Sequence, residues 1–196
     1  MSNLRIGALV LAAGESRRMG YPKPLLMLQG ENFINTILRT VEKCRLEPVI
    51  VVTGFRADEV EQSIKPVKGL KIIRNECWME GQGTSIAAGI AAFPDDVQAV
   101  IIMLVDQPRV SVDLLSMLVK HYTTTPKPII ITMSGGYVTP PTLMDASCFE
   151  ALKGLKGDEG AKKLLKSFEY KTCLWEGDDS LVDIDTPQEY DAIKGK

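Results

Sequence analysis

The chain has 196 residues, a length that predicts one domain over residues 1–196. Apolar residues make up 45% and charged residues 24%, which is ordinary globular usage and excludes collagen, coiled coil and wholesale disorder. The 23 Lys and Arg against 25 Asp and Glu leave a net charge of -2, so no basic field draws nucleic acid non-specifically. The apolar runs are too short to span a membrane, so neither nucleic acid nor membrane is expected as a partner.

Apolar runs rich in β-branched residues recur along the chain and predict buried strands. They lack period-two alternation, which is typical of strands covered on both faces. The predicted strands are Ile6–Ala12, Pro48–Thr53, Leu70–Ile73, Ala99–Val105 and Pro128–Thr132. Between them, apolar residues at helical spacing predict helices at Asn32–Cys44, Ala57–Ile64, Ser85–Phe93 and Val112–His121. This alternation predicts an α/β fold, Rossmann-like, with a largely parallel (mixed) sheet and helices on both faces.

The last third of the chain breaks this alternation. It contains Gly135-Gly136, Pro140-Pro141, helical stretches around Ala151 and Ala161, and a strand-like run at Lys171–Trp175. We expect these segments to supply extra strands and helices that complete the same domain and cap its site.

The cysteines and the single histidine exclude several kinds of chemistry. Cys44, Cys77, Cys148 and Cys173 form no CxxC pair, so we expect scattered buried thiols in a reducing, cytoplasmic setting rather than a zinc site. The only histidine, His121, is expected at a helix end. A Ser-His-Asp triad and a multi-histidine metal site are therefore both discarded.

The loop after the first predicted strand has the composition of a phosphate-binding loop. It reads LAAGESRRMGYPK and places the cations Arg17, Arg18 and Lys23 beside two glycines. Open α/β sheets bind ligands at the carboxyl ends of their strands, and loop amides with cations suit a polyphosphate. The loop is neither a Walker loop nor a GxGxxG fingerprint. The alternative, a solvated basic turn, is less favoured because the cations directly follow a buried strand.

Carboxylates occur at two further places where a metal could be held. Asp106 ends the fourth predicted strand, where a carboxylate is costly unless it meets water, a cation or a metal. Mg²⁺ bound to substrate phosphates commonly uses one or two such groups. Asp106 could instead cap the next helix, although Ser111 is better placed to do so. Asp183 and Asp185 alternate in an extended run and so point to the same side, with helix capping as their alternative role.

Together these segments resemble the MobA-like nucleotidyltransferase family, especially its molybdenum cofactor cytidylyltransferase branch. The loop from Leu11 to Lys23 matches the family signature LAAGxSxRMGxPK. The other matching segments are WMEGQGTSIAAG (78–89), VDQP (105–108), GDEGA (157–161) and DIDTP (183–187). The resemblance covers the chain nearly end to end and implies a fold of the nucleotide-diphospho-sugar-transferase type.

The resemblance also implies an activity and a site. The activity would be transfer of CMP from CTP to the phosphate of molybdopterin, with Mg²⁺ as cofactor and release of pyrophosphate. Carried over, Arg18, Lys23 and Asp106 would be catalytic, and Asp106 and Asp185 would hold Mg²⁺. The nucleotide-binding residues would be Leu11, Ala12, Ala13, Gly14, Ser16, Arg17, Lys23, Gly83, Thr84, Ser85 and Asp106. This chain has Leu11-Ala12-Ala13-Gly14, whereas guanylyl-transferring relatives resemble Leu-Ala-Gly-Gly at the same place. The alanine at position 13 therefore favours CTP over GTP as the donor.

One departure from the family pattern concerns the acceptor. Thr139-Pro140-Pro141 stands where the family usually has Gly-His-Pro, in a segment expected to border the acceptor. Two alternatives therefore stay open. One is a transferase of the same fold that uses GTP or acts on a sugar or polyol phosphate. The other is a non-enzymatic protein that hands finished molybdenum cofactor to a partner molybdenum hydroxylase, although mere binding needs no metal-holding pair such as Asp106 and Asp185.

Overall fold

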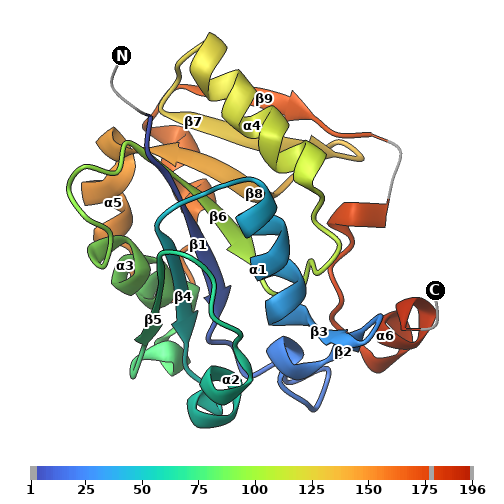
Figure 1. Cartoon of the computed structure of the whole chain (residues 1–196). Helices are drawn as coiled ribbons and strands as arrows, with labels where there is room; N and C mark the ends of the chain where they lie inside the picture. The colour runs from blue at the N-terminus through green and yellow to red at the C-terminus, as the bar shows by residue number, and fades with distance from the viewer. Residues whose placement is uncertain (1–3, 177–178, 195–196) are drawn as a thin grey trace.

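A seven-stranded mixed sheet runs through the computed structural model, which describes residues 4–176 and 179–194 (Figure 1). Its strands are β1 (Ile6–Ala12), β4 (Val49–Thr53), β5 (Leu70–Arg74), β6 (Ala99–Leu104), β7 (Ile129–Ser134), β8 (Tyr137–Asp145) and β9 (Tyr170–Leu174). The order is β5-β4-β1-β6-β8-β7-β9, and only β8 runs antiparallel to its neighbours. A separate ribbon pairs β2 (Met27–Leu28) with β3 (Glu31–Asn32). The predicted α/β fold with a largely parallel sheet is confirmed.

Helices cover both faces of this sheet. On one face lie α1 (Phe33–Lys43) and α4 (Val112–Thr124), and on the other lie α3 (Gln82–Ala91) and α5 (Phe149–Lys153). The remaining α-helices are α2 (Ala57–Ser63) and α6 (Pro187–Ile193). Short 3-10 turns form η1 (Lys23–Leu25), η2 (Trp78–Glu80), η3 (Ala146–Cys148), η4 (Ala161–Lys166) and η5 (Asp179–Leu181).

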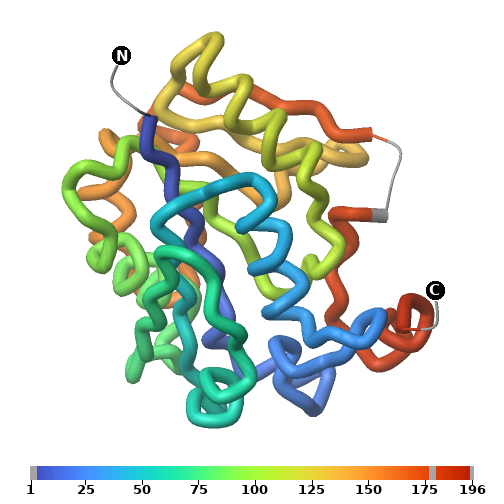
Figure 2. Tube along the Cα trace, viewed as in Figure 1, coloured from blue at the N-terminus to red at the C-terminus, as the bar shows by residue number. Residues whose placement is uncertain are grey.

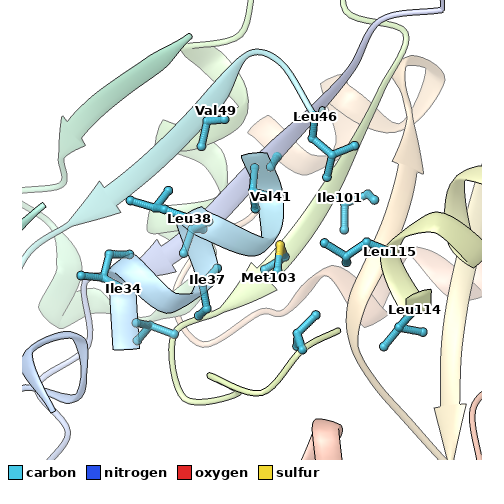
Figure 3. Packing of buried hydrophobic residues seen from close by; sticks show 14 of the residues in the cluster. Ile34, Ile37, Leu38, Val41, Leu46, Val49, Ile101, Met103, Leu114 and Leu115 are labelled. Carbon is cyan, nitrogen blue, oxygen red and sulfur yellow. The ribbon is translucent and has the colours of Figure 1, made fainter. Parts of the chain in front are cut away.

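Alternate residues of the central strands divide the core into two layers. Along β1, Ala8 and Val10 face α1 and α4, whereas Leu9 and Leu11 face α3 and α5. Both sets are buried, which is why the sequence of this strand is apolar without alternation. Figure 3 shows the first layer, where apolar side chains of α1 pack against those of β6 and α4.

Two boundaries differ from the sequence prediction for a physical reason. Helix α3 begins at Gln82 rather than at Ser85, because Gly81, with φ of 122°, makes the turn that precedes it. Strand β8 includes Pro140-Pro141, although proline cannot donate a ladder hydrogen bond. The paired residues of β8 with β7 and β6 lie on either side of the two prolines, and the register with β7 shifts beside them.

The four cysteines are all free, but they are not all buried. Cys148 and Cys173 are buried, Cys44 is half-buried and Cys77 is exposed in the segment after β5. The expectation of buried thiols is therefore wrong for Cys77. No helix in residues 4–176 and 179–194 is long and apolar enough to cross a membrane.

The C-terminal segment returns to the N-terminal loop, as the red and blue stretches of Figure 2 show. The Ile184 amide donates to the Asp106 carbonyl at 2.9 Å, and the Tyr190 hydroxyl donates to the Met27 carbonyl at 2.9 Å. Tyr190 also packs edge-on against Phe33. This return brings the acidic run before α6 to the carboxyl ends of β1 and β6.

Candidate active site

A cavity of about 460 Å³ opens at the carboxyl ends of β1 and β6. Its lining comes from the loop after β1, from the segment leading into α3 and from the end of β6. The lining residues are Leu11, Ala13, Gly14, Glu15, Ser16, Arg17, Lys23, Trp78, Met79, Gly81, Gln82, Ser85, Leu104, Val105, Asp106 and Asp158. The position agrees with the general rule for ligands of open α/β sheets.

Lys23 lies between two carboxylates at this cavity. Its Nζ donates to Asp185 Oδ1 at 2.5 Å and to Asp106 Oδ2 at 3.1 Å. The Lys23 side chain is only 9% exposed, so the ammonium is held in a largely desolvated place. Arg18 donates from Nη2 to Asp185 Oδ2 at 2.7 Å. The structure thus brings together all four residues predicted to hold phosphate and metal.

The backbone of the first loop places these cations. Ser16 and Gly20 both have positive φ, of 58° and 70°, and the Ser16 carbonyl accepts from the amides of Met19 and Gly20. This turn reverses the chain so that Lys23, which opens η1, returns to the end of β1. The Lys23 amide also donates to Ser16 Oγ at 3.4 Å.

Asp106 and Asp185 differ in their electrostatic state. Burial raises the pKa of Asp106, although the charge of Lys23 opposes it. Burial also acts to raise the pKa of Asp185, but its bond to Lys23 and the charges of Lys23 and Arg18 lower it overall. Asp106 Oδ1 is buried and accepts no hydrogen bond from any described residue. This oxygen is therefore free to meet a cation.

Gln107 is a site residue that sequence reasoning missed. It is completely buried, and its Nε2 donates to Asp183 Oδ1 at 2.8 Å and to Thr139 Oγ1 at 2.9 Å. The amide thereby joins the acidic run before α6 to β8, next to Asp106 in the chain. The sequence feature that could have identified Gln107 is a polar amide at the end of a buried strand, within the VDQP segment.

The segment before α3 contributes to the cavity differently from the prediction. Ser85 lines it, but Gly83 and Thr84 do not. The Gly83 amide donates to the Gly157 carbonyl at 2.8 Å, and Thr84 Oγ1 lies within hydrogen-bonding distance of the carbonyls of Cys77 and Gly81, at 3.0 and 2.9 Å. Gly81 and Gln82 take the expected place, with Trp78 and Met79 beside them.

Of the other residues predicted to bind the nucleotide, some line the smaller cavity and others do not. Ala12 is buried in the core and does not reach the cavity, whereas Leu11, Ala13 and Gly14 do. Arg17 lines the cavity but is 83% exposed and pairs with Glu15 at 2.6 Å.

A second cavity of about 800 Å³ adjoins the first. Both are lined by Leu11, Gln82, Leu104 and Asp158, so they share one wall. The far side of the larger cavity is formed by the β7–β8 turn and by η4. Thr139 and Pro140 line it, whereas His121 lies in the last turn of α4 and lines neither cavity.

Comparison with known families shows which family the chain belongs to. The model of the MobA-like NTP transferase domain matches residues 8–173. The chain belongs to this family. The predicted resemblance to MobA-like nucleotidyltransferases is therefore confirmed, while the finer reaction is a separate question.

Curated relatives cover nearly the whole chain. The purine catabolism protein PucB of Bacillus subtilis is 38% identical over 94% of this chain and 93% of its own length. The nicotine blue oxidoreductase of Paenarthrobacter nicotinovorans is 27% identical over 94% of both chains. The molybdenum cofactor cytidylyltransferase of Escherichia coli is 24% identical over 96% of this chain and 95% of its own.

Solved structures share the fold of this MobA-like chain. An Rv0371c homolog from Mycobacterium sp. strain JC1 superposes with a TM-score of 0.85, at 25% identity over 98% of this chain and 97% of its own. Rv0371c of Mycobacterium tuberculosis, in a complex with manganese, has a TM-score of 0.80 at 22% identity, over 98% of this chain and 99% of its own.

Proposed function

We propose that this MobA-like nucleotidyltransferase transfers CMP from CTP to the phosphate of molybdopterin. The observation that carries the proposal is the position of Lys23 between Asp106 and Asp185, at a nucleotide-sized cavity that shares a wall with a second, larger one. A transferase needs two substrates side by side, and the adjoining cavities supply that arrangement. The triphosphate occupies the smaller cavity and the acceptor the larger.

The reaction is an in-line displacement at phosphorus. An oxygen of the acceptor phosphate attacks the α-phosphorus of CTP, a new P–O bond forms, and the bond from the α-phosphorus to the bridging oxygen breaks as pyrophosphate leaves. Lys23 and Arg18 neutralise the charge that collects on the phosphates. A phosphate nucleophile is already ionised at neutral pH, so the distance of His121 from the site poses no difficulty.

The carboxylates fit a divalent cation that is held mainly by the nucleotide. Residues 4–176 and 179–194 contain no group of three or more His, Cys, Asp or Glu residues that could hold a metal by themselves. Asp106 and Asp185 do present two carboxylates, and Asp106 Oδ1 lacks a partner among described residues. Mg²⁺ would be held by these two residues and would supply further charge neutralisation of the triphosphate. Rv0371c, which binds manganese in its solved complex, supports a divalent ion here.

The relatives support the acceptor and its setting. One of them is named a molybdenum cofactor cytidylyltransferase, and the more similar PucB is named for purine catabolism. We propose delivery of the product to a molybdenum hydroxylase as the physiological purpose. The free cysteines agree with the predicted cytoplasmic location.

The test is pyrophosphate release by the purified protein with Mg²⁺, each nucleoside triphosphate and molybdopterin. We expect release to require both CTP and molybdopterin, with kcat/KM for CTP exceeding that for GTP by about tenfold or more. The Ala13→Gly variant should have a lower ratio of kcat/KM for CTP to kcat/KM for GTP than the wild type. A preference for GTP would show that the protein is not a cytidylyltransferase, and a preference for a sugar or polyol phosphate would show that molybdopterin is not its acceptor. Binding of finished molybdenum cofactor without turnover would indicate a carrier protein.

A further inference from the structure

Asn75 directly follows β5 and is buried, with 6% of its surface exposed, yet it lines neither cavity. We propose that Asn75 is a positioning residue for the nucleotide, which orients the hydroxyl group of Ser85 so that its hydrogen points into the smaller cavity. This inference rests on the proposed function, because the smaller cavity is where we propose that the nucleotide binds. It adds a residue that acts on the nucleotide through a neighbour.

The orientation of the Asn75 amide is fixed by the backbone beside it. Its Oδ1 accepts from the Cys77 amide at 3.0 Å. A backbone N–H can only donate, so the atom facing it must be the side-chain oxygen, and the nitrogen must face the other way. Nδ2 then donates its two hydrogens to Thr84 Oγ1 and to Ser85 Oγ, both at 2.9 Å. The Asn75 amide group thereby joins the end of β5 to the start of α3.

The two hydroxyl groups that accept from Asn75 differ in where their own hydrogen can go. Thr84 Oγ1 lies 2.9 Å from the Gly81 carbonyl and 3.0 Å from the Cys77 carbonyl, so its hydrogen has an acceptor nearby. Ser85 Oγ meets no acceptor for its hydrogen among residues 4–176 and 179–194. Ser85 is only 4% exposed and lines the smaller cavity. A buried hydroxyl normally uses its hydrogen, and the cavity is where the Ser85 hydroxyl can meet an acceptor.

The residue at position 75 therefore decides what Ser85 offers to a nucleotide. While Asn75 donates to Ser85 Oγ, the hydroxyl hydrogen is left for a carbonyl oxygen or a ring nitrogen of the ligand. An ionised aspartate at this position would only accept. The Ser85 hydrogen would then turn toward that carboxylate, and only lone pairs of Ser85 would face the cavity.

Calorimetric titration of the full chain with CTP and Mg²⁺, without any acceptor, tests the inference. We expect Asn75→Asp and Ser85→Ala each to raise the Kd of CTP by about tenfold, as loss of one buried hydrogen bond predicts. The double variant Asn75→Asp/Ser85→Ala should bind CTP no more weakly than Ser85→Ala alone, because Asn75 acts through Ser85. If Asn75→Asp does not fold, Asn75→Ala gives the same cycle with a smaller increase of about threefold, since it removes the donor without reversing the hydroxyl.

Asn35→Asp is the matched control for a purely structural effect. Asn35 is also a buried asparagine, 4% exposed, whose Nδ2 donates to the Ser63 carbonyl and whose Oδ1 accepts from the Lys65 amide, both at 2.8 Å. It lines neither cavity. Its substitution should lower the free energy of unfolding in urea, as Asn75→Asp does, yet leave the Kd of CTP unchanged.

The titrations separate this inference from the proposed function. If the wild type binds CTP but releases no pyrophosphate with molybdopterin, the proposed function fails and the Kd values still decide the inference. If the wild type binds GTP instead, the cytidylyl proposal fails and the same cycle is measured with GTP. An equal Kd in wild type and Asn75→Asp, additive effects in the double variant, or no binding of either triphosphate by wild type would overturn the inference.

Discussion

Lys23 has a structural role besides the phosphate-binding role that we propose, because its buried ammonium lies between two carboxylates. Removing it leaves Asp106 without its cationic partner and leaves Arg18 as the partner of Asp185. The guanidinium of Arg18, which is 70% exposed, pairs with Asp185 alone among residues 4–176 and 179–194, and we expect it to contribute less to folding. The two cations predicted together from one loop are therefore not equivalent.

We expect Lys23→Ala to lower turnover by roughly a hundredfold and to cost about 1–3 kcal/mol of unfolding free energy. Arg18→Ala should reduce turnover without a measurable loss of stability, since exposed substitutions stay within about 0.5 kcal/mol. Pyrophosphate release and urea unfolding of both variants check this. Near-normal turnover in both would contradict the assignment of this loop to phosphate.

Substitutions of the three acidic residues of the site should reduce turnover to different extents, according to the contacts of each residue. Asp106→Asn and Asp185→Asn should abolish Mg²⁺-dependent turnover, because these carboxylates flank Lys23. Asp183→Asn should be milder, because Asp183 is bound by the Gln107 amide instead. Titration of Mg²⁺ against turnover measures the ranking. A nucleotide complex with the metal on Asp183 alone would reverse it.

At the scale of elements, a half-buried polar contact joins α2 to β4 and β5 at the sheet edge. Glu61 accepts from Thr53 Oγ1 of β4 at 2.7 Å and from Arg74 of β5 at 2.8 and 3.1 Å. The hydrogen bond from Arg74 lowers the pKa of Glu61 below its ordinary 4.5, against the opposing effect of partial burial. The folded state therefore favours the ionised form of Glu61.

We expect Glu61→Gln to destabilise the protein by about 1 kcal/mol at neutral pH. Because the folded-state pKa is lowered, the contribution of Glu61 is fully present above its unfolded pKa and is lost as the pH falls through the folded pKa. Urea unfolding of wild type and variant between pH 7 and pH 3, roughly, should show their difference shrinking toward the acid end. A difference that is constant over this range would show that the charge of Glu61 does not matter.

At the scale of the whole molecule, the smaller cavity, where we propose that CTP binds, joins segments far apart in the chain. Lys23 and Asp185 are separated by 162 positions, and Asp158 reaches the same cavity from the last third of the chain. A ligand that bridges these segments stabilises the folded state because the unfolded chain cannot present them together.

We expect CTP with Mg²⁺ at 100 times its Kd to stabilise the protein by about 2.7 kcal/mol, which raises Tm by roughly 5–10 °C for a chain of this size. GTP at the same concentration should give a smaller shift. Thermal unfolding measures both, with Lys23→Ala as the control that loses the response. Equal shifts for CTP and GTP would contradict selection by this cavity.

The sequence by itself determined the parallel strands of the sheet, the helices between them and the cations of the first loop, because these depend on local patterns, but it did not predict β8 as a strand. Continuous apolar strands, the helical spacing of apolar residues in Asn32–Cys44 and the cations after β1 are all readable within a short window. Only the tertiary structure decided that Lys23 separates Asp106 from Asp185, and that Gln107 ties Asp183 to β8. It also decided that Gly83 packs on the backbone near Lys156 instead of lining the cavity. These contacts join residues far apart in the chain, and no local periodicity encodes their distances.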